Sequence, residues 1–297
     1  FLKKCLFSIL NQSFKEFELI VIDNNSSDGT SEYLNNITDK RLRVFKINNN
    51  GMYVKSRNLG IKNSRADWIA FIDTDDIWFS EKLEKCHEVI NKKDVDLIYH
   101  SVNYINKKNF SKIIKEKSKR ISVPVEKYLY SNGNIIAQSS VVVKKRKLEE
   151  IGYFSEKKEF YGWEDFDAWI RLAFNSNKFY FLNLALGGLW FGKSNISNIK
   201  LMKDNLDSIA YFYNDICLSK YNFEIKHTWW FIYNQSLYFF KNKKFNEVLN
   251  CCKIIPKCEF KFYIRLLYFK YFSIYMKSSY FLIKIIQKTF KKIFNKN

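Results

Sequence analysis

The sequence is poor in the residues that interrupt regular structure. Its 297 residues include only 2 prolines and 9 glycines, and no glycine follows Gly192. So little proline and glycine excludes collagen-like and proline-rich linker sequences. The hydrophobic content of 47% is too high for a disordered chain. A chain of this length can bury a large core without disulfides or a structural metal.

Cysteines and long apolar segments are scarce as well. The six cysteines follow no regular spacing, and no histidine accompanies them at the spacing of a zinc site. We therefore expect reduced, buried thiols in a reducing compartment. The sequence has no run of 18 uncharged apolar residues and no visible secretory signal. It therefore predicts no membrane-spanning helix.

Acidic residues are outnumbered by basic ones. The chain has 50 Lys and Arg against 30 Asp and Glu, a net charge of +20. Much of the excess lies in residues 193–297, which hold 19 Lys or Arg and 6 Asp or Glu. This composition favours a phosphate-bearing partner or an anionic membrane surface. A general bias of the sequence toward Lys, Asn, Ile and Phe is the alternative explanation.

The first two thirds of the chain alternate between apolar strands and helices. Runs rich in apolar and β-branched residues predict strands at residues 17–22, 42–47, 68–72 and 95–99. This order predicts an α/β, Rossmann-like fold with a mostly parallel sheet flanked by helices. The loops after the first and third of these strands would meet at the carboxyl edge of the sheet, where such folds bind ligands.

The last third has a different, α-helical pattern. Apolar residues at three- and four-residue spacing predict helices over residues 229–240, 246–255 and 262–275. Residues 281–294 mix apolar residues with Lys, as in a basic amphipathic helix on an anionic membrane surface. A terminal helix packed on its own domain is the alternative. We expect two regions, residues 1–198 and residues 199–297.

Three carboxylates follow the predicted strand at residues 68–72. Asp73, Asp75 and Asp76 are crowded into four positions at the end of this apolar run. Carboxylates at the end of a buried strand repel one another, and a divalent cation would relieve that repulsion. Mg²⁺ and Mn²⁺ prefer oxygen ligands of this kind. A solvated turn that caps a helix is the alternative explanation.

Two further polar groups stand at the ends of predicted elements. Asp23 and Asn24 follow the strand at residues 17–22 and could hydrogen-bond a base or a ribose, although a turn or helix cap explains them as well. Asp165 stands where a glycine-containing loop enters a helix, with Trp163 beside it. A carboxylate there could accept a proton from a hydroxyl, or could simply cap the helix.

Taken in series, these stretches resemble the inverting glycosyltransferases of family 2, which have the GT-A fold. The matching stretches follow the order of the family over residues 1–198, and Asp73-Thr74-Asp75 matches its metal-binding Asp-x-Asp. They are residues 7–14, 17–30, 50–51, 56–60, 71–76, 151–154 and 162–165, followed by Arg171. Each stretch is weak alone, but together they are specific.

The resemblance implies a role for each acid of the site. Asp75 would bind Mn²⁺ or Mg²⁺ bridging the nucleotide diphosphate, and Asp73 would contact the ribose or the metal shell. Asp165 would be the catalytic base, with Glu164 and Trp163 on the acceptor side. One base suffices because a single displacement inverts the anomeric centre. A positioned base typically contributes ~10²–10⁴-fold to the rate.

The resemblance also implies a nucleotide-binding side. Asp23 and Asn24 would meet the nucleobase, with Arg57 and Asn58 nearby. Many members of the family have two acids where Asp23 and Asn24 stand. Many also have a histidine near the end of the domain, where this chain has Lys193, which could contact phosphate as a point charge.

The implied activity is transfer of a sugar from a nucleotide-sugar, UDP-linked, to a hydroxyl of a cell-surface glycan or lipid-linked acceptor. Polysaccharide or lipopolysaccharide synthesis on the cytoplasmic face of the membrane would use such an enzyme. Family members open with an apolar strand that this sequence lacks. We expect the chain without that strand to bind sugar nucleotide poorly, because its neighbours would keep unpaired backbone groups.

Two other interpretations compete with an active transferase. The chain could be a degenerate, inactive glycosyltransferase that has lost its first strand. It could also be a basic nucleic-acid-binding or membrane-binding protein, for which the Lys-rich residues 107–127 are the best support. Nucleic-acid binding has no use for clustered acids, so we expect no nucleic-acid partner.

Overall fold

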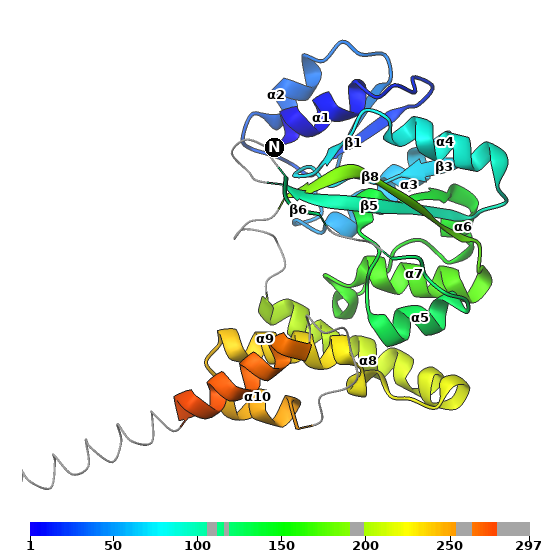
Figure 1. Ribbon diagram of the computed structural model, residues 1–297. Coiled ribbons are helices and arrows are strands. Elements are labelled where there is room, and N and C mark those ends of the chain that lie inside the picture. Colours follow the sequence, from blue (N-terminus) through cyan, green and yellow to red (C-terminus); the bar gives the residue numbers. More distant parts are fainter. Residues whose placement is uncertain (106–111, 116–118, 191–198, 254–262, 278–297) are drawn as a thin grey trace, which may run out of the picture. The chain divides into compact units, whose positions relative to one another are not determined.

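The computed structural model describes residues 1–105, 112–115, 119–190, 199–253 and 263–277. Contacts divide the chain into two compact units (Figure 1). The first unit contains residues 1–129 and 134–197, and the second contains residues 130–133 and 198–297. Nothing in the sequence indicated that residues 130–133 belong with the second unit.

The first unit contains two sheets. A parallel pair consists of β1 (Leu19–Asp23) and β2 (Leu42–Lys46). The larger sheet has the order β3 (Trp68–Ala70), β7 (Val142–Lys144), β5 (Leu97–Ile105), β8 (Phe179–Trp190) and β4 (Ile77–Trp78), with β6 (Lys112–Lys115) paired to β5. Within this sheet β5 and β8 are parallel, whereas the other pairs are antiparallel.

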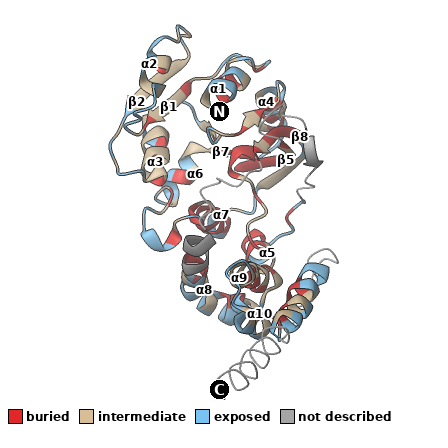
Figure 2. Ribbon diagram, turned by 90° about the vertical axis from the view of Figure 1, so that its left-hand side faces the viewer, coloured by how far each residue is buried: buried red, intermediate tan, exposed pale blue. Residues whose placement is uncertain are grey.

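The sheet is therefore mixed, and the prediction of a mostly parallel sheet was wrong on this point. Leu97, Ile98 and Tyr99 of β5 are fully buried (Figure 2). A strand buried on both faces has a continuous apolar sequence whatever the direction of its neighbours. The apolar runs thus indicated strands correctly, but they held no information about strand direction.

Helices cover these sheets. They are α1 (Leu2–Leu10), α2 (Thr30–Asn35), α3 (Tyr53–Asn63), α4 (Lys82–Lys92), α5 (Val125–Asn132), α6 (Lys145–Glu150) and α7 (Glu164–Asn175), with short 3₁₀ turns η1 (Gln138–Ser140) and η2 (Lys158–Phe160). Leu6 and Ile9 of α1 pack with Leu19 of β1 and Leu34 of α2 in one core cluster. Ala70 of β3 packs against the same cluster, although no backbone ladder joins β1 to β3.

The second unit is helical, as predicted. It contains α8 (Ile199–Tyr221), η3 (Ile225–His227), α9 (Trp229–Lys241), α10 (Phe245–Cys251) and a helix over residues 263–277. Val248, Cys252, Leu266 and Phe269 form its core with Ile232. No disulfide joins the five described cysteines, four of which are buried.

Two sequence-based predictions fall beyond the described residues. Lys193 and the basic segment 281–294 both lie there. In the described part of the chain, no helix is both long enough and apolar enough to cross a bilayer.

Candidate active site

The loop that follows β3 carries the Asp-x-Asp sequence, and Ser139 of η1 holds it in place. The N–H of Asp73 donates to Ser139 Oγ at 3.0 Å, and this hydroxyl donates to Asp76 Oδ2 at 2.6 Å. Asp76 is buried and also accepts the N–H of Trp190 at 3.1 Å. Burial and the nearby charge of Asp73 raise the pKa of Asp76 to about 7. Asp76 therefore anchors the loop from inside the protein.

Asp73 and Asp75 are the more accessible acids of this loop. The side chain of Asp73 is 51% exposed, and Asp75 is half-buried. Burial and the charge of Asp73 raise the pKa of Asp75, so a bound cation would offset an unfavourable charge.

The residues present fit a metal site that the substrate completes. Within the described ranges, no cluster of three or more His, Cys, Asp or Glu side chains is arranged to hold a metal ion. Mg²⁺, however, is commonly bound by one or two carboxylates and takes its other ligands from substrate phosphates and water. Asp73 and Asp75 match this second kind of site.

Glu164, the first residue of α7, is buried, and hydrogen bonds to its carboxylate compensate the cost of burying its charge. Its Oε2 accepts the Tyr53 hydroxyl at 3.0 Å and the N–H of Gly162 at 2.8 Å. Its Oε1 accepts Nη1 of Arg57 at 3.1 Å. Burying a charge is costly unless it is paired and hydrogen-bonded, and these three donors meet that condition. Glu164 therefore fixes the loop before α7 onto α3.

Asp165 lies in the first turn of α7, as the sequence predicted. Its carboxyl accepts Nδ2 of Asn134 at 2.9 Å and the N–H of Phe166 at 2.7 Å. The residue stays partly accessible, although protein atoms crowd its carboxyl. This crowding, followed by the charge of Glu164, raises the pKa of Asp165 to about 7. A carboxyl with such a pKa changes charge near neutral pH, which suits a general base.

Arg57 of α3 joins the two acidic loops. Its Nη2 lies 3.4 Å from Asp73 Oδ1, its Nη1 lies 3.1 Å from Glu164 Oε1, and its side chain is 13% exposed. Burial by itself would lower the pKa of Arg57, but the charges of Asp73, Glu164 and Asp165 outweigh burial and raise it. Acids that are far apart in the sequence thus gather around one guanidinium.

Asp23 and Asn24 are engaged in holding loops together. Asp23 is buried at the end of β1 and accepts the Ser31 hydroxyl and, at 3.0 Å, the N–H of Ser26. The bond from Ser31 is the main cause of its lowered pKa. Asn24 Nδ2 donates to Asn49 Oδ1 at 2.5 Å, and the N–H of Asn49 donates to Asn24 Oδ1 at 3.1 Å. The loops after β1 and β2 are therefore tied to each other.

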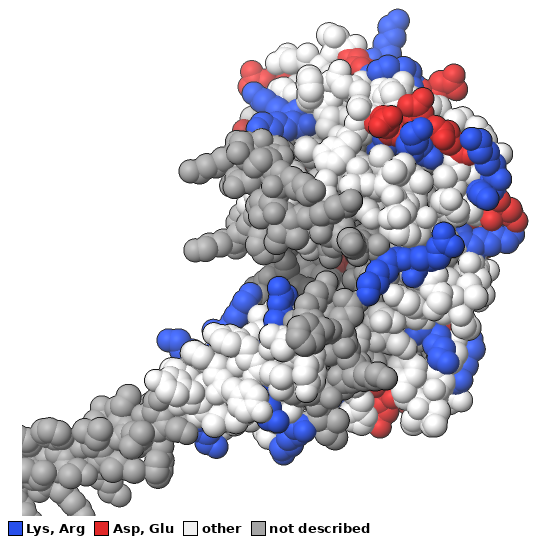
Figure 3. All heavy atoms as spheres, in the orientation of Figure 1, with Lys and Arg blue, Asp and Glu red and all other residues white. Residues whose placement is uncertain are grey.

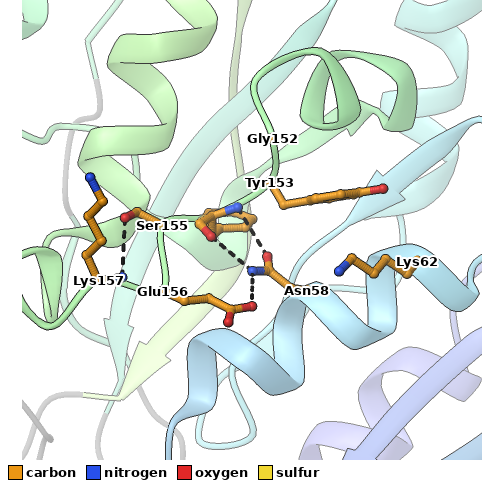
Figure 4. A pocket seen from close by; sticks show the side chains of 8 residues that line it. Asn58, Lys62, Gly152, Tyr153, Ser155, Glu156 and Lys157 are labelled. Carbon is orange, nitrogen blue, oxygen red and sulfur yellow. Dashed lines mark hydrogen bonds between the residues drawn. The ribbon is translucent and has the colours of Figure 1, made fainter.

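Asn58 connects α3 to the loop at residues 152–157. Its Nδ2 donates to the Phe154 carbonyl and to Glu156 Oε1, both at 2.9 Å, and its Oδ1 accepts the N–H of Phe154 at 3.1 Å. Figure 4 shows this side chain pointing from the helix to the loop, where Lys62 and Lys157 line the same pocket of about 430 Å³. Asn58 thus shapes the pocket wall with both ends of its amide.

Helix α7 holds the same loop from its other side. Arg171 donates to Asp167 Oδ2 at 2.6 Å and to the Tyr153 carbonyl at 2.9 Å. Trp163, which directly precedes α7, is buried with its ring centre 5.9 Å from that of Phe166. The stretches of the Gly-Trp-Glu-Asp and Ile-Gly-Tyr-Phe motifs are therefore packed together.

Four residues that build this site had escaped the sequence analysis. Tyr53 stands four positions before Arg57, so helical spacing alone could have placed both on one face of α3. Asn49, Asn134 and Ser139 gave no comparable signal, since each acts through a partner that is distant in sequence.

Similar proteins are known by sequence and by structure. The sequence model of glycosyl transferase family 2 matches residues 1–152. An uncharacterised glycosyltransferase of Methanocaldococcus jannaschii is 29% identical over 184 residues, which cover 60% of this chain and 62% of that protein. The UDP-Glc:α-D-GlcNAc-diphosphoundecaprenol β-1,3-glucosyltransferase of Escherichia coli is 31% identical over 99 residues, which cover 33% of this chain and 39% of that enzyme.

Solved structures share the fold. S. aureus TarS 1–349 in complex with UDP-GlcNAc superimposes with a TM-score of 0.60 at 18% identity, covering 86% of this chain and 78% of that one. The first unit is therefore an α/β, GT-A-like fold with a mixed sheet, followed by a helical region. The chain spans less than two thirds of both curated relatives. Because the family match covers more than half of its residues, this chain belongs to glycosyl transferase family 2.

Proposed function

We propose that this chain is an inverting glycosyltransferase that moves a sugar from a UDP-sugar to a hydroxyl of a lipid-linked or cell-surface glycan acceptor. The observation that carries the proposal is the position of Arg57, which binds both Asp73 and Glu164, the neighbour of Asp165. Donor-side acids and a candidate base thus belong to one site in one compact unit.

The chemistry needs one base on the acceptor side. Asp165, in its deprotonated form, takes the proton of the acceptor hydroxyl as that oxygen attacks the anomeric carbon. The bond from this carbon to the diphosphate breaks on the opposite side, so the configuration is inverted. Asn134 holds the base at Oδ2, and the crowding of the carboxyl by protein atoms, followed by the charge of Glu164, keeps the pKa of Asp165 high. Mn²⁺ or Mg²⁺, held by Asp75 with Asp73, would offset the charge of the departing diphosphate.

The nucleotide would meet the loops after β1 and β2. Asp23 already accepts two hydrogen bonds, but a carboxylate has about four acceptor positions and could still accept the N–H of a uracil. Asn24 and Asn49 hold the two loops at a fixed separation. Asn58 contributes by shaping the adjacent pocket.

Two observations support a lipid-linked acceptor, namely the names of the relatives and the charge of the last third of the chain. The related enzyme of E. coli is named for a UDP-Glc donor and a diphosphoundecaprenol-linked acceptor, and TarS was solved with UDP-GlcNAc. A lipid-linked acceptor fits the net charge of +13 in residues 193–297, because anionic lipids attract basic segments. We place the protein on the cytoplasmic face of the membrane as a peripheral protein, with Glu164 and Trp163 on the acceptor side.

Activity is tested with a panel of UDP-glucose, UDP-galactose and UDP-GlcNAc, by measuring UDP release with Mn²⁺, with Mg²⁺ and with EDTA. We expect one donor to be turned over in the presence of metal. Asp165→Asn should lower the rate by ~10²–10⁴-fold, and Asp75→Ala should abolish the response to metal.

The matched control is Asp67→Asn, which changes an exposed acid just before β3. This variant should keep the rate of the unaltered protein. Near-normal, metal-dependent transfer by Asp165→Asn or by Asp75→Ala would show that the role assigned to that residue is wrong. A protein that releases UDP from no donor, with or without an apolar strand added before residue 1, would contradict the proposed function itself.

A further inference from the structure

A short segment connects the two acidic loops of the proposed active site. At its start, Asn134 Nδ2 donates to Asp165 Oδ2 at 2.9 Å. At its end, Ser139 Oγ accepts the N–H of Asp73 at 3.0 Å and donates to Asp76. Residues 134–139 therefore run from the candidate base to the donor-side acids.

Gln138, within this segment, has a buried amide without partners. The residue is only 8% exposed, and in the described part of the chain neither Nε2 nor Oε1 makes a hydrogen bond. A buried polar group without a partner destabilises the folded state, because it has lost its hydrogen bonds to water. The neighbouring side chains are satisfied, since Ser140 Oγ donates to the Ala137 carbonyl at 2.7 Å. The unused amide is thus a local exception in a well-bonded turn.

A second buried glutamine shows what a structural amide looks like in this protein. Gln12 has no exposed surface, and its Nε2 donates to the carbonyls of Ser8 at 3.0 Å and Phe79 at 2.9 Å. Its Oε1 accepts the N–H of Leu83 at 3.0 Å. Gln12 is used entirely for folding, whereas the described contacts assign Gln138 no such use.

We propose that Gln138 binds a hydroxyl of the transferred sugar and takes part in selecting the donor, an inference that rests on the proposed function. During inversion the sugar ring must lie between the acceptor hydroxyl at Asp165 and the diphosphate at Asp73 and Asp75. An amide supplies two donors and one acceptor oxygen, and a sugar hydroxyl both donates and accepts. A site built to hydrogen-bond a hydroxyl rejects donors that do not present one there.

The test compares Gln138→Leu with the unaltered protein, because leucine has a similar volume and no polar atoms. We expect kcat/KM for the preferred UDP-sugar to fall about fivefold to tenfold or more, with the Kd of UDP alone unchanged. The differences in kcat/KM among UDP-glucose, UDP-galactose and UDP-GlcNAc should become smaller. The Tm of the ligand-free variant should be equal to or higher than that of the unaltered protein, because an unpaired buried amide has been removed.

Gln12→Leu is the matched control, and its Tm should fall because three hydrogen bonds are lost. If Gln138→Leu lowers the Tm in the same way, or keeps both its kcat/KM and its donor preference, the assignment of Gln138 is overturned. Calorimetric titration with UDP and with each UDP-sugar distinguishes a wrong assignment of Gln138 from a wrong proposed function. An unaltered protein that binds no UDP-sugar overturns the proposed function together with this inference.

Discussion

Asp165 has an unusual environment for a carboxyl near a protein surface. Crowding by protein atoms and the charge of Glu164 raise its pKa from the ordinary 3.8 to about 7. A base works only when it is deprotonated, so we expect the transfer rate to rise with pH through about 7 and to level off above it. A rate that is constant from pH 5.5 to 8.5 would contradict this role.

The same pKa has a consequence for stability. A carboxyl whose pKa is raised by folding binds its proton more tightly in the folded state, so the folded state loses stability as pH rises from about 4 through about 7. Asp165→Asn removes this loss. Thermal unfolding should therefore show that the Tm of Asp165→Asn, relative to that of the unaltered protein, increases as the pH is raised from 5 to 8.

Arg57 is the residue on which the geometry of the site depends most. Arg57→Ala would leave Glu164, whose side chain is 7% exposed, without its cation. Removing one partner of a buried ion pair costs about 3–5 kcal/mol, and we expect a decrease of this size in the free energy of unfolding. Urea unfolding measures it.

The control for Arg57 is Arg146→Ala at the surface pair with Glu150. The side chain of Arg146 is 69% exposed, so this change should cost at most ~1 kcal/mol. Equal effects of the two substitutions would show that Arg57 is not buried in the way described.

At the scale of elements, the end of α5 and Gly133 pack on Trp230 of α9 within the helical unit. Gly133 has a φ of +77°, and a Cβ atom there would lie 2.8 Å from Cγ of Trp230. The indole of Trp230 also donates to the Tyr130 carbonyl at 2.8 Å. Gly133→Ala therefore adds a steric clash to the strain of a left-handed backbone, and we expect a loss of about 2–4 kcal/mol of stability.

Gly29→Ala separates the strain of a left-handed backbone from the steric clash. Gly29 has a φ of +81°, but no heavy atom lies within 4 Å of the added Cβ. Only the backbone strain of ~1–2 kcal/mol remains there. Urea unfolding followed by tryptophan fluorescence compares the variants, and a Gly133→Ala protein no less stable than Gly29→Ala would disprove the packing of Gly133 on Trp230.

The strands and helices that the sequence predicted formed near their expected positions, but other strands and the pairing directions did not follow from it. The run at residues 42–47 became β2 and the helical pattern at residues 229–240 became α9, because both signals are local periodicities. Strands β4, β6, β7 and β8 were not anticipated, and the antiparallel pairing of β7 with β3 and β5 makes the sheet mixed. Pairing direction depends on the path of the chain between strands, which the composition of the strands does not record.

At the scale of the whole molecule, the basic and aromatic residues predict binding to anionic membranes. Figure 3 shows Lys and Arg side chains over the helical unit. The helix at residues 263–277 exposes Tyr263, Ile264 and Tyr271 and contains no acidic residue. Tyrosine favours the membrane–water interface, and each basic residue near an anionic surface contributes about 1 kcal/mol.

Vesicle sedimentation tests this surface. We expect the protein to bind vesicles that contain phosphatidylglycerol, to bind less as salt is raised, and to leave pure phosphatidylcholine vesicles unbound. Tyr263→Ser combined with Tyr271→Ser should weaken binding. Phe7→Ser is the control, because Phe7 is 70% exposed but belongs to α1 of the first unit. Equal binding to neutral and anionic vesicles would contradict the prediction.

The sequence by itself determined the family, the order of the acidic motifs, and the division between an α/β part and a helical part. These properties depend on residues that are near one another in the chain. Only the tertiary structure decided that Asp76 anchors the loop while Asp75 stays accessible, and that Arg57 joins two acidic loops. Burial and hydrogen-bond partners come from segments that folding brings together, so no local pattern could have shown which of these aspartates is buried.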